Sequence, residues 1–310
     1  MTVLGIDIGG TRIKTGLVGA DGAIVVERAV RTPDTVDGFR TVLGETLELG
    51  AAQAAGIGCK GIVDAADTRI VALPGTLHFL EGHYLRDLMP PGVRVAADND
   101  ARAAMAGEWA WGAARGRRNA MLLTLGTGVG GAAVVEGQLL RGHGGVGGHL
   151  GHVTVEPDGE TCICGSRGCL ETVFSAHAIE GQALAAVHRG CASTLTELFF
   201  ERRGELTCRA VFEAAAEGDA VARQIVERAT HRLGAAVAGL VHVFDPEIVI
   251  LGGQIAEAGP VLLEPVARAV AWRTHGLLRR TVPVVRAEIT SGVAGAAALA
   301  MRMFPAPTVK

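Results

Sequence analysis

The sequence predicts an α/β protein with two domains. Strand patterns alternate with helix patterns after a glycine-tipped group of strands at the start, and a similar pattern begins again near residue 121. With 310 residues and 49% hydrophobic content, the chain is long enough to bury two cores. We therefore expect two α/β domains with a cleft between them.

The first half is expected to open with a β-meander, in which short glycine turns join neighbouring strands. Its predicted strands are residues 3–8, 13–18 and 23–29. The pattern then changes to that of an amphipathic helix. The elements expected from there are a helix over 39–55, strands at 56–63 and 93–97, and a helix over 101–111.

The second half repeats the opening pattern. Strands are predicted at 121–125 and 129–135, on either side of the turn Gly126-Thr127-Gly128. Residues 176–239 are expected to be helical, and residues 247–251 to form a further strand. Because each half presents a glycine–threonine turn between two strands, the two halves are expected to resemble each other.

The two glycine–threonine turns indicate a polyphosphate site. Backbone N–H groups of a glycine turn can approach anionic oxygens closely, and a threonine hydroxyl adds a donor. Either turn alone is weak evidence, since most glycine turns simply reverse the chain. Together they favour nucleotide binding, and the phosphate ligands would be Gly9, Gly10, Thr11, Thr127 and Gly128.

Two charged residues accompany the first turn. Asp7 ends the first strand, where a carboxylate beside phosphates would hold a hydrated Mg²⁺; its alternative role is to cap the turn. Lys14 could neutralise phosphate charge, although a lysine in a hairpin is often only solvated.

A polar triplet, Asp98-Asn99-Asp100, stands where a predicted strand gives way to a helix. One of the three should be the helix N-cap. A second acid then remains, and the helix dipole keeps a carboxylate at this position ionised. Such a group suits a general base that accepts a hydroxyl proton late in phosphoryl transfer, and Asp100 is the candidate.

One histidine and three cysteines, His152, Cys162, Cys164 and Cys169, lie within eighteen residues. Tetrahedral zinc prefers four nitrogen and sulfur ligands of this kind. The alternatives are disulfides or unused core thiols, but Cys-Ile-Cys is too short for a disulfide of normal geometry. The glycines at 165 and 168 provide tight turns. The sequence therefore predicts a closed, structural zinc site.

The remaining composition limits the partners and the compartment. The other cysteines, Cys59, Cys191 and Cys208, are isolated and no secretory signal is visible, which predicts a cytoplasmic protein. No apolar run approaches the roughly 18 residues that span a bilayer. The formal net charge of −3 gives no general attraction for nucleic acid or membranes, so a small neutral or anionic ligand is expected.

These motifs resemble the ROK family (repressors, open reading frames and sugar kinases) of the actin, Hsp70 and hexokinase superfamily, over nearly the whole chain. The matching segments are Asp7-Ile-Gly-Gly10-Thr11, Asn99-Asp100, Leu125-Gly-Thr127-Gly128-Val-Gly130-Gly, Gly151-His152, the cysteine segment ending in Cys169-Leu-Glu171, and Ile250-Leu-Gly252-Gly253. The resemblance implies two actin/hexokinase-like, ribonuclease H-like domains flanking a cleft. It also implies a homodimeric, ATP- and Mg²⁺-dependent hexose kinase that phosphorylates a primary hydroxyl.

The resemblance also implies roles for individual residues. Asp100 would be the base, and the sugar would be held by the residues that match Asn99, His152 and Glu171, with the segment around Gly61 forming a sugar loop. His152 would present one ring nitrogen to zinc and the other to the sugar. Gly252 and Gly253 would lie beside the adenosine. The implied domains are 1–116 with 291–310, where residues 292–303 form a returning helix, and 117–290.

The chain departs from the family pattern at three positions near the expected sugar. Relatives read Glu-x-Gly-His where this chain has His149-Leu-Gly-His152, and Gly-x-Pro-Gly where it has Gly58-Cys-Lys60-Gly61. The family's Pro-Asn corresponds to Pro74-Gly75. An imidazole at 149 offers the sugar different hydrogen bonds from a carboxylate. We therefore expect a hexose or hexose-like substrate other than glucose.

Two alternatives to an enzyme are considered, and the first is not expected. A sugar-sensing repressor would need a DNA-binding module ahead of the kinase fold, and only six residues precede Asp7. A non-catalytic sugar-binding regulator would have kept the fold without turnover, although the chain retains Asp100 and both glycine turns. The identity of the sugar and the use of a donor other than ATP do not follow from the sequence.

Overall fold

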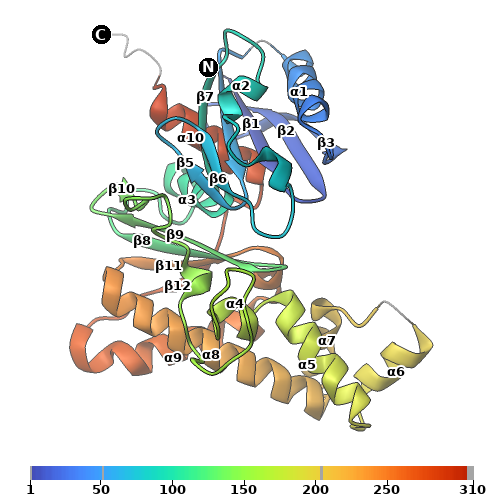
Figure 1. Ribbon diagram of the computed structural model, residues 1–310. Helices are drawn as coiled ribbons and strands as arrows, with labels where there is room; N and C mark the ends of the chain where they lie inside the picture. Colours follow the sequence, from blue (N-terminus) through green and yellow to red (C-terminus); the bar gives the residue numbers. More distant parts are fainter. Residues whose placement is uncertain (1, 51, 203–204, 306–310) are drawn as a thin grey trace. The chain divides into compact units, whose positions relative to one another are not determined.

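The computed structural model describes residues 2–50, 52–202 and 205–305 (Figure 1). By its internal contacts the chain divides into two compact units. The first comprises Met1–Arg117, Ala132–Gly148 and Glu288–Lys310, and the second Arg118–Gly131 and His149–Ala287. The domain ranges inferred from the sequence stay a prediction; residues 132–148, placed there in the second domain, group by contacts with the first unit.

The first unit is built on a five-stranded mixed sheet of order β3-β2-β1-β4-β7. Its strands are β1 (Val3–Ile8), β2 (Arg12–Val18), β3 (Ile24–Arg31), β4 (Ala54–Cys59) and β7 (Arg94–Asn99). The first three run antiparallel as the predicted meander, whereas β1, β4 and β7 are parallel neighbours. The ends of these parallel strands therefore meet at one edge of the sheet, where Asp7 and Asn99 lie.

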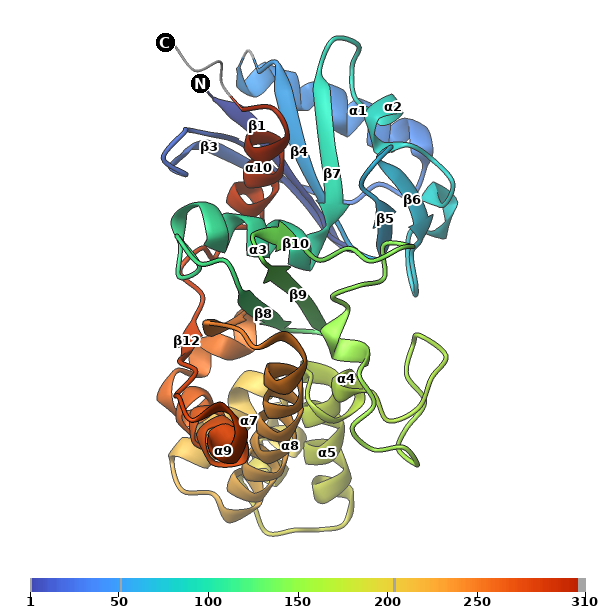
Figure 2. The same cartoon turned by 90° about the vertical axis from the view of Figure 1, so that its left-hand side faces the viewer.

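Helix α10 (Gly292–Met303), the last helix predicted from the sequence, packs on β1 and β4 and against α3 (Asp100–Trp111) (Figure 2). The sheet carries glycines beneath this helix, at positions 5 and 56. A Cβ atom at either position would collide with the backbone of α10, so the helix packs directly on the backbone of the strands. The small residues of α10 complete the contact, and most of them are fully buried. The C-terminal helix is thus part of the core of the first unit.

The helix predicted over 39–55 is too long. Helix α1 spans Val36–Glu45, a 3-10 turn follows over Thr46–Leu49, and Ala51 lies outside the described residues. Gly50 has a φ of 150°, which favours glycine and ends the helical path. Residues 54–59 instead form β4, and 55–59 pair in parallel with β1, since the buried alanines of β4 fit a central strand as well as a helix.

The predicted strand 56–63 is likewise divided into β4 and the short β5 (Ile62–Asp64), which forms a two-stranded sheet with β6 (Arg69–Ala72). Gly61 separates the two strands with a φ of 83°. The unit also contains short helical turns at His78–Leu80 and α2 (Leu85–Leu88).

The second sheet has the order β10-β9-β8-β11-β12. Its strands are β8 (Ala120–Leu125), β9 (Val129–Val135), β10 (Gln138–Leu139), β11 (Ile248–Gly252) and β12 (Val284–Arg286). Strand β11 pairs in parallel with both β8 and β12. The predicted strands 121–125, 129–135 and 247–251 are confirmed to within one residue at each end.

Helices of the second unit supply most of its hydrophobic core. They are α4 (Leu170–Val173), α5 (Ala176–His188), α6 (Thr194–Glu201), α7 (Cys208–Ala216), α8 (Ala220–Phe244) and α9 (Pro260–Leu278), with 3-10 turns at Leu150–His152 and Gln254–Ala258. The helical stretch predicted over 176–239 is thus four helices, while residues 203–204 lie outside the described residues. Side-chain N-caps at Ser175, Ser193, Thr207 and Asp219 start them.

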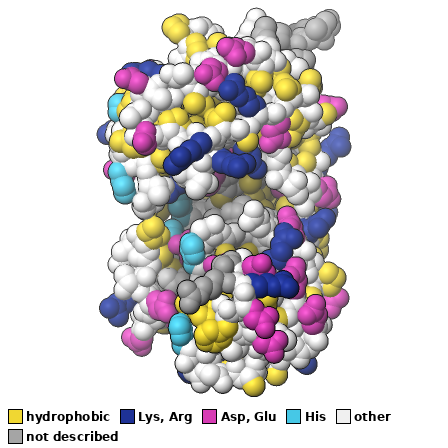
Figure 3. Space-filling model, turned by 90° about the vertical axis from the view of Figure 1, so that its right-hand side faces the viewer, with side chains coloured by type: hydrophobic (Ala, Val, Ile, Leu, Met, Phe, Trp, Pro, Cys, Tyr) yellow, Lys and Arg dark blue, Asp and Glu magenta, His cyan; other side chains and the backbone are white. Residues whose placement is uncertain are grey.

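Charged side chains of both signs are interspersed over the face shown in Figure 3, in keeping with the formal net charge of −3. Among the described residues, no helix is long and apolar enough to cross a bilayer.

Candidate active site

Asp7 lies at the edge of the first sheet where parallel strands end. In the strand register it lies opposite Lys14 on β2 and Gly58 on β4. Burial and, to a smaller extent, the nearby carboxylate of Asp100 together raise the pKa of Asp7 to about 6, while Lys14 opposes the rise. The start of α10 covers Asp7, since a side chain at Gly292 would collide with its carboxyl group. A cation bound near Asp7, in addition to Lys14, would therefore stabilise the ionised carboxylate of Asp7.

The first glycine turn, residues 9–11, connects β1 to β2. Gly9 N donates to Arg12 O at 3.0 Å, and Thr32 closes the turn from outside through its hydroxyl to Gly9 O at 2.8 Å and its N–H to Thr11 O at 3.0 Å. Gly10 and Thr11 stay exposed. The turn therefore has a fixed shape and an open surface, as a phosphate site requires.

Within the polar triplet 98–100, Asn99 and Asp100 have different positions at the start of α3. Asn99 is the N-cap of α3: its Oδ1 accepts from Ala101 N at 3.0 Å and Arg102 N at 3.3 Å, and its Nδ2 donates to Gly61 O at 3.0 Å. Asp100 is the first residue of the helix and is exposed. The expectation that one of the three caps the helix is confirmed. The cap leaves Asp100 at the positive end of the helix dipole.

Gly61 and Lys60 lie beside these groups. Lys60 Nζ donates to Thr76 Oγ1 at 2.6 Å, and Thr76 lies next to Gly10, where an added Cβ would be 3.3 Å from its hydroxyl. The Gly61 carbonyl is held by Asn99. The first unit thus gathers the predicted residues Asp7, Gly9, Gly10, Thr11, Lys14, Gly61, Asn99 and Asp100 around one edge of its sheet.

The second glycine turn, residues 126–128, is closed by Gly126 N donating to Gly128 O at 3.0 Å and joined to α5 by Ala176 N donating to Gly126 O at 2.9 Å. Glu171 lies directly against it. Its Oε2 accepts from Val129 N at 2.9 Å, and a side chain at Gly128 would collide with this carboxylate. Glu171 is therefore fixed by the turn that the sequence assigns to phosphate.

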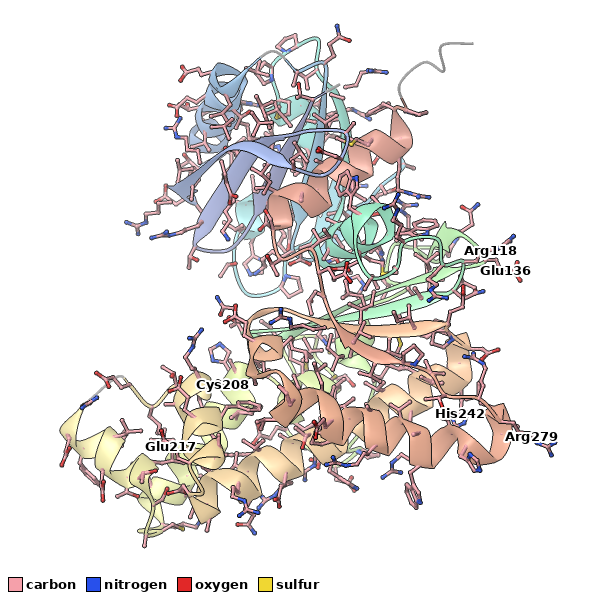
Figure 4. The ribbon with its side chains drawn as sticks, turned by 180° about the vertical axis from the view of Figure 1, so that it is seen from behind. Arg118, Glu136, Cys208, Glu217, His242 and Arg279 are labelled. Carbon is pink, nitrogen blue, oxygen red and sulfur yellow. The ribbon has the colours of Figure 1, made fainter. Side chains whose placement is uncertain are left out.

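A cavity of about 740 Å³ opens beside this turn within the second unit. Its walls come from Gly126, Thr127, the start of α5, one side of α7 from Cys208 to Ala216, and residues between Gln254 and Val261. Apolar side chains such as Phe212 and Ile255 mix with polar ones such as His177 and Glu180. Figure 4 labels Cys208, the first residue of α7, which is part of this wall. The volume and the mixed lining suit a nucleoside.

Strand β11 ends at Gly252, and Gly253 follows it near the same turn. Gly253 has a φ of 82°, and a Cβ atom there would collide with the backbone of Leu125, the last residue of β8. The two glycines thus allow β11 to leave the sheet in close contact with the second glycine turn.

His152, Cys162, Cys164 and Cys169 form a compact cluster, in which the four ligand atoms all lie within 4.8 Å of one another. Cys164 and Cys169 have their Sγ atoms 3.6 Å apart, and His152 Nδ1 is 3.5 Å from Cys162 Sγ. Tetrahedral zinc with Zn–S bonds of about 2.3 Å would separate its sulfurs by about 3.8 Å. These distances fit a zinc site. All six cysteines are free thiols, so the disulfide alternative is not realised.

The backbone of the cysteine segment is shaped for this cluster. Gly165 and Gly168 have φ values of 88° and 62°, as the sequence suggested, and a side chain at Gly168 would overlap Glu156 O. Cys162 Sγ also contacts Glu171 Oε1 at 3.7 Å. The carboxylate of Glu171 therefore joins the cluster to the second glycine turn.

His149 lies beside the cluster. Its ring is nearly parallel to that of His152, with the two centroids 6.4 Å apart and an interplanar angle of 15°. It precedes the turn Leu150–His152, whose Gly151 has no room for a side chain because of Val129 O. The second unit thus gathers Thr127, Gly128, His149, His152, Glu171, Gly252 and Gly253 around the glycine turn and the cysteine cluster.

The ROK family model matches residues 3–303. The chain belongs to the ROK family. A glucokinase of Thermotoga maritima is 37% identical over 96% of this chain and 97% of its own, and an N-acetylmannosamine kinase of Shigella flexneri is 34% identical over 83% and 84%.

Solved structures agree with this assignment. The crystal structure of a ROK family glucokinase from Streptomyces griseus in complex with glucose and AMPPNP is 32% identical, with a TM-score of 0.84 over 97% of this chain and 100% of that one. The ROK hexokinase from Thermus thermophilus is 31% identical, with a TM-score of 0.79 over 98% and 99%. The predicted actin/hexokinase-like α/β fold class is therefore confirmed.

Sequence reasoning overlooked two features of this ROK protein. It did not assign the walls of the nucleoside-sized cavity on α5 and α7, although the capping residues Ser175 and Thr207 mark the helix starts that line it. It also left Arg102 and Arg141 unassigned, although both bind the buried carboxylate of Asp98. Asp98 belongs to β7 and Arg102 to α3, so this pair crosses a junction between a strand and a helix, and no helical spacing rule indicates it.

Proposed function

We propose that this chain is an ATP-dependent kinase that transfers the γ-phosphoryl group to a primary hydroxyl of a hexose or hexose-like substrate, with Asp100 as the general base. The observation that carries the proposal is the position of Asp100 at the N-terminus of α3, close enough to Asp7 to raise its pKa, at the sheet edge that also bears the first glycine turn.

In the proposed reaction, Asp100 accepts the proton of the attacking hydroxyl as the hydroxyl oxygen forms a bond to the γ-phosphorus. The bond between that phosphorus and the β,γ-bridging oxygen breaks, and ADP leaves with its electron pair. The positive end of the helix dipole favours the charged form of a carboxylate at this position. Because the proton moves late, a carboxylate of ordinary basicity is sufficient.

Mg²⁺ is implied by an ATP-dependent kinase, and the carboxylate of Asp7 fits it. Hard cations prefer oxygen ligands. Burial already raises the pKa of Asp7 to about 6, so a divalent cation would stabilise its charged form. When bound, the ion would neutralise charge on the phosphates. Lys14, which lies opposite Asp7 in the β1–β2 strand register, would assist.

ATP would be held by both glycine turns and by the cavity beside the second. We assign the phosphates to Gly9, Gly10, Thr11 and Lys14 in the first unit and to Thr127 and Gly128 in the second, and the adenosine to the 740 Å³ cavity next to Gly252 and Gly253. Exposed backbone N–H groups at both turns supply donors without side-chain bulk.

The sugar would be held by Gly61, Asn99 and Asp100 from one unit and by His149, His152 and Glu171 from the other. Asn99 and Glu171 already hydrogen-bond the backbone, so each would reach the sugar through its remaining capacity: the second Nδ2 hydrogen, and lone pairs on the carboxylate. His149 supports a substrate other than glucose, because an imidazole pairs with different hydroxyl arrangements than a carboxylate does.

Zinc in the cysteine cluster would have a structural role. Four protein ligands leave no open position for chemistry, and the ion would fix the ring of His152 with Nδ1 toward the metal. We also propose that the protein is a cytoplasmic homodimer. A non-catalytic sugar-sensing regulator is not favoured, because the relatives above 30% identity named above are kinases.

The test is an ADP-release assay of the purified chain over a panel of hexoses, N-acetylated hexosamines and cyclitols, with Mg²⁺-ATP. Sugar-dependent ADP release that disappears in Asp100→Asn is expected. Sugar binding without turnover by the wild-type chain would make it a sensor, and the proposal would fail.

A further inference from the structure

Asp98 is a fully buried carboxylate with two arginine partners. Arg102 Nη1 donates to its Oδ1 at 2.9 Å, and Arg141 Nε donates to its Oδ2 at 2.7 Å. The side chain of Arg102 is 1% exposed, whereas that of Arg141 is 44% exposed. We refer to Asp98, Arg102 and Arg141 as the Asp98 clamp. A buried group of this kind is expensive to desolvate, so its hydrogen bonds must be complete.

The remaining N–H donors of Arg102 bind three backbone carbonyls of a segment that is distant in the sequence. Its Nε donates to Leu140 O at 3.1 Å, and its Nη2 to Gly145 O at 2.6 Å and Gly147 O at 2.5 Å. Four N–H···O contacts thus fan out from one planar guanidinium. A lysine could not reproduce this pattern, because its ammonium is a compact point donor.

The bound segment, residues 141–148, is a glycine loop with the sequence Arg-Gly-His-Gly-Gly-Val-Gly-Gly. It has no regular secondary structure, and its internal backbone bond runs from Gly147 N to Arg141 O at 2.9 Å. Five glycines in eight residues give the chain unusual conformational freedom and few side chains for packing. The Asp98 clamp therefore takes the place of secondary structure in holding this loop.

The loop lies next to the groups proposed to hold the sugar in the same unit. A Cβ atom at Gly145 would be 3.2 Å from Val63 O, two residues beyond Gly61. Asp98 itself directly precedes Asn99 in the chain, and its Oδ1 accepts a hydrogen bond from Asn99 N at 2.8 Å. Along the chain, Gly148 is followed by His149. One carboxylate thus links the loop to the end of β7, where Asn99 and the proposed base Asp100 stand.

We propose that Arg102 is a positioning residue, which fixes the glycine loop 141–148 as a wall of the sugar site by joining it through Asp98 to the strand that carries Asn99 and Asp100. The proposal rests on the proposed kinase function for its effect on turnover. The loop's attachment to Arg102 is a structural property that can be measured without activity.

The test variant is Arg102→Lys, which keeps a positive charge next to Asp98 but cannot bind all three carbonyls. Hydrogen exchange of peptides covering 141–148 should speed up about tenfold or more, as expected from losing charge-assisted hydrogen bonds. Exchange in β1 and β4 should stay unchanged. The matched control is Arg86→Lys, because Arg86 also donates to a backbone carbonyl of the first unit, that of Asp67, but at an exposed site.

Steady-state kinetics then separates positioning from general damage. In Arg102→Lys, KM for the sugar should rise roughly ten- to hundredfold, the scale of a misplaced binding group. KM for ATP should change less than about twofold, since Arg102 binds carbonyls of Leu140, Gly145 and Gly147 and none of the residues assigned to ATP. Equal increases for both substrates, or unchanged loop exchange together with unchanged sugar KM, would overturn the proposal.

Arg141→Gln covers the case in which Arg102→Lys does not fold. Arg141 is part of the loop and largely exposed, so its loss removes one clamp contact and leaves Asp98 paired with Arg102. Loop exchange should speed up by a smaller factor than in Arg102→Lys; unchanged exchange would contradict the clamp. If the wild type shows no phosphoryl transfer, the proposed function fails, while the exchange measurements still decide whether Arg102 holds the loop.

Discussion

Replacing Asp7 by asparagine should stabilise the ligand-free protein at neutral pH while removing its activity. The pKa of Asp7 rises from an ordinary 3.8 to about 6, chiefly through burial. The folded state therefore binds this proton more tightly than the unfolded state, and ionised Asp7 destabilises the fold. The penalty is absent below the unfolded pKa, grows as the pH rises from 3.8 to 6, and is complete above that range.

The magnitude follows from these two pKa values. At about 1.36 kcal/mol for each pH unit of difference, the penalty is at most about 3 kcal/mol at pH 8 and about 1.6 kcal/mol at pH 5. Asparagine has nearly the same shape and carries no charge, so Asp7→Asn should recover most of this energy. The same change should weaken Mg²⁺-dependent turnover, because an amide is a poorer ligand than a carboxylate.

The assay is urea unfolding of the first unit at pH 8 and pH 5, in the absence of Mg²⁺ and ATP. Trp109 and Trp111 on α3 report on this unit, and a Trp272→Phe background removes the tryptophan of the second unit. Asp34→Asn, an exposed aspartate of the same unit, is the control. The reasoning is refuted if Asp7→Asn is no more stable than the wild type at pH 8, or if its advantage does not shrink at pH 5.

Three further predictions concern the other proposed groups. Asp100→Asn should keep sugar binding near normal and lower kcat by roughly 10²–10⁴, and a variant with more than about a tenth of wild-type kcat would remove the base assignment. Metal analysis should find about one zinc per chain, and Cys164→Ser should lose the metal, folded stability and activity, whereas a metal-free protein with normal folding and turnover would contradict the role of His152. His149→Glu should shift relative kcat/KM toward glucose; if glucose is already the best substrate of the wild type, or if all substrate ratios stay unchanged, His149 does not set specificity.

Short-range chemistry explains what the sequence predicted well. The strands at 3–8 and 129–135 and the final helix at 292–303 have the predicted bounds, because alternating or continuous apolar runs end at glycine or polar residues there. The cysteine cluster could also be predicted from the sequence, since all its ligands lie within one local segment.

Contacts between distant segments explain what was missed. Helix α1 stops ten residues before its predicted end, because alanines at 54 and 55 are taken into a parallel strand that only the full sheet can define. Arg102 binds carbonyls about forty residues away, and nothing in its neighbourhood in the chain indicates them. The roles of the candidate site residues toward sugar and nucleotide stay predictions.

The position of α10 has a consequence for how the chain folds during synthesis. Strands β1 and β4 are complete within the first 59 residues, but the helix that covers them begins only at Gly292. At roughly 5–20 residues per second, a ribosome needs about 9–35 s to proceed from residue 117 to that helix. For this time the nascent first unit exposes the apolar sheet face around Val3, Val18 and Ala54, so its completion must wait for the whole of the second unit to be translated.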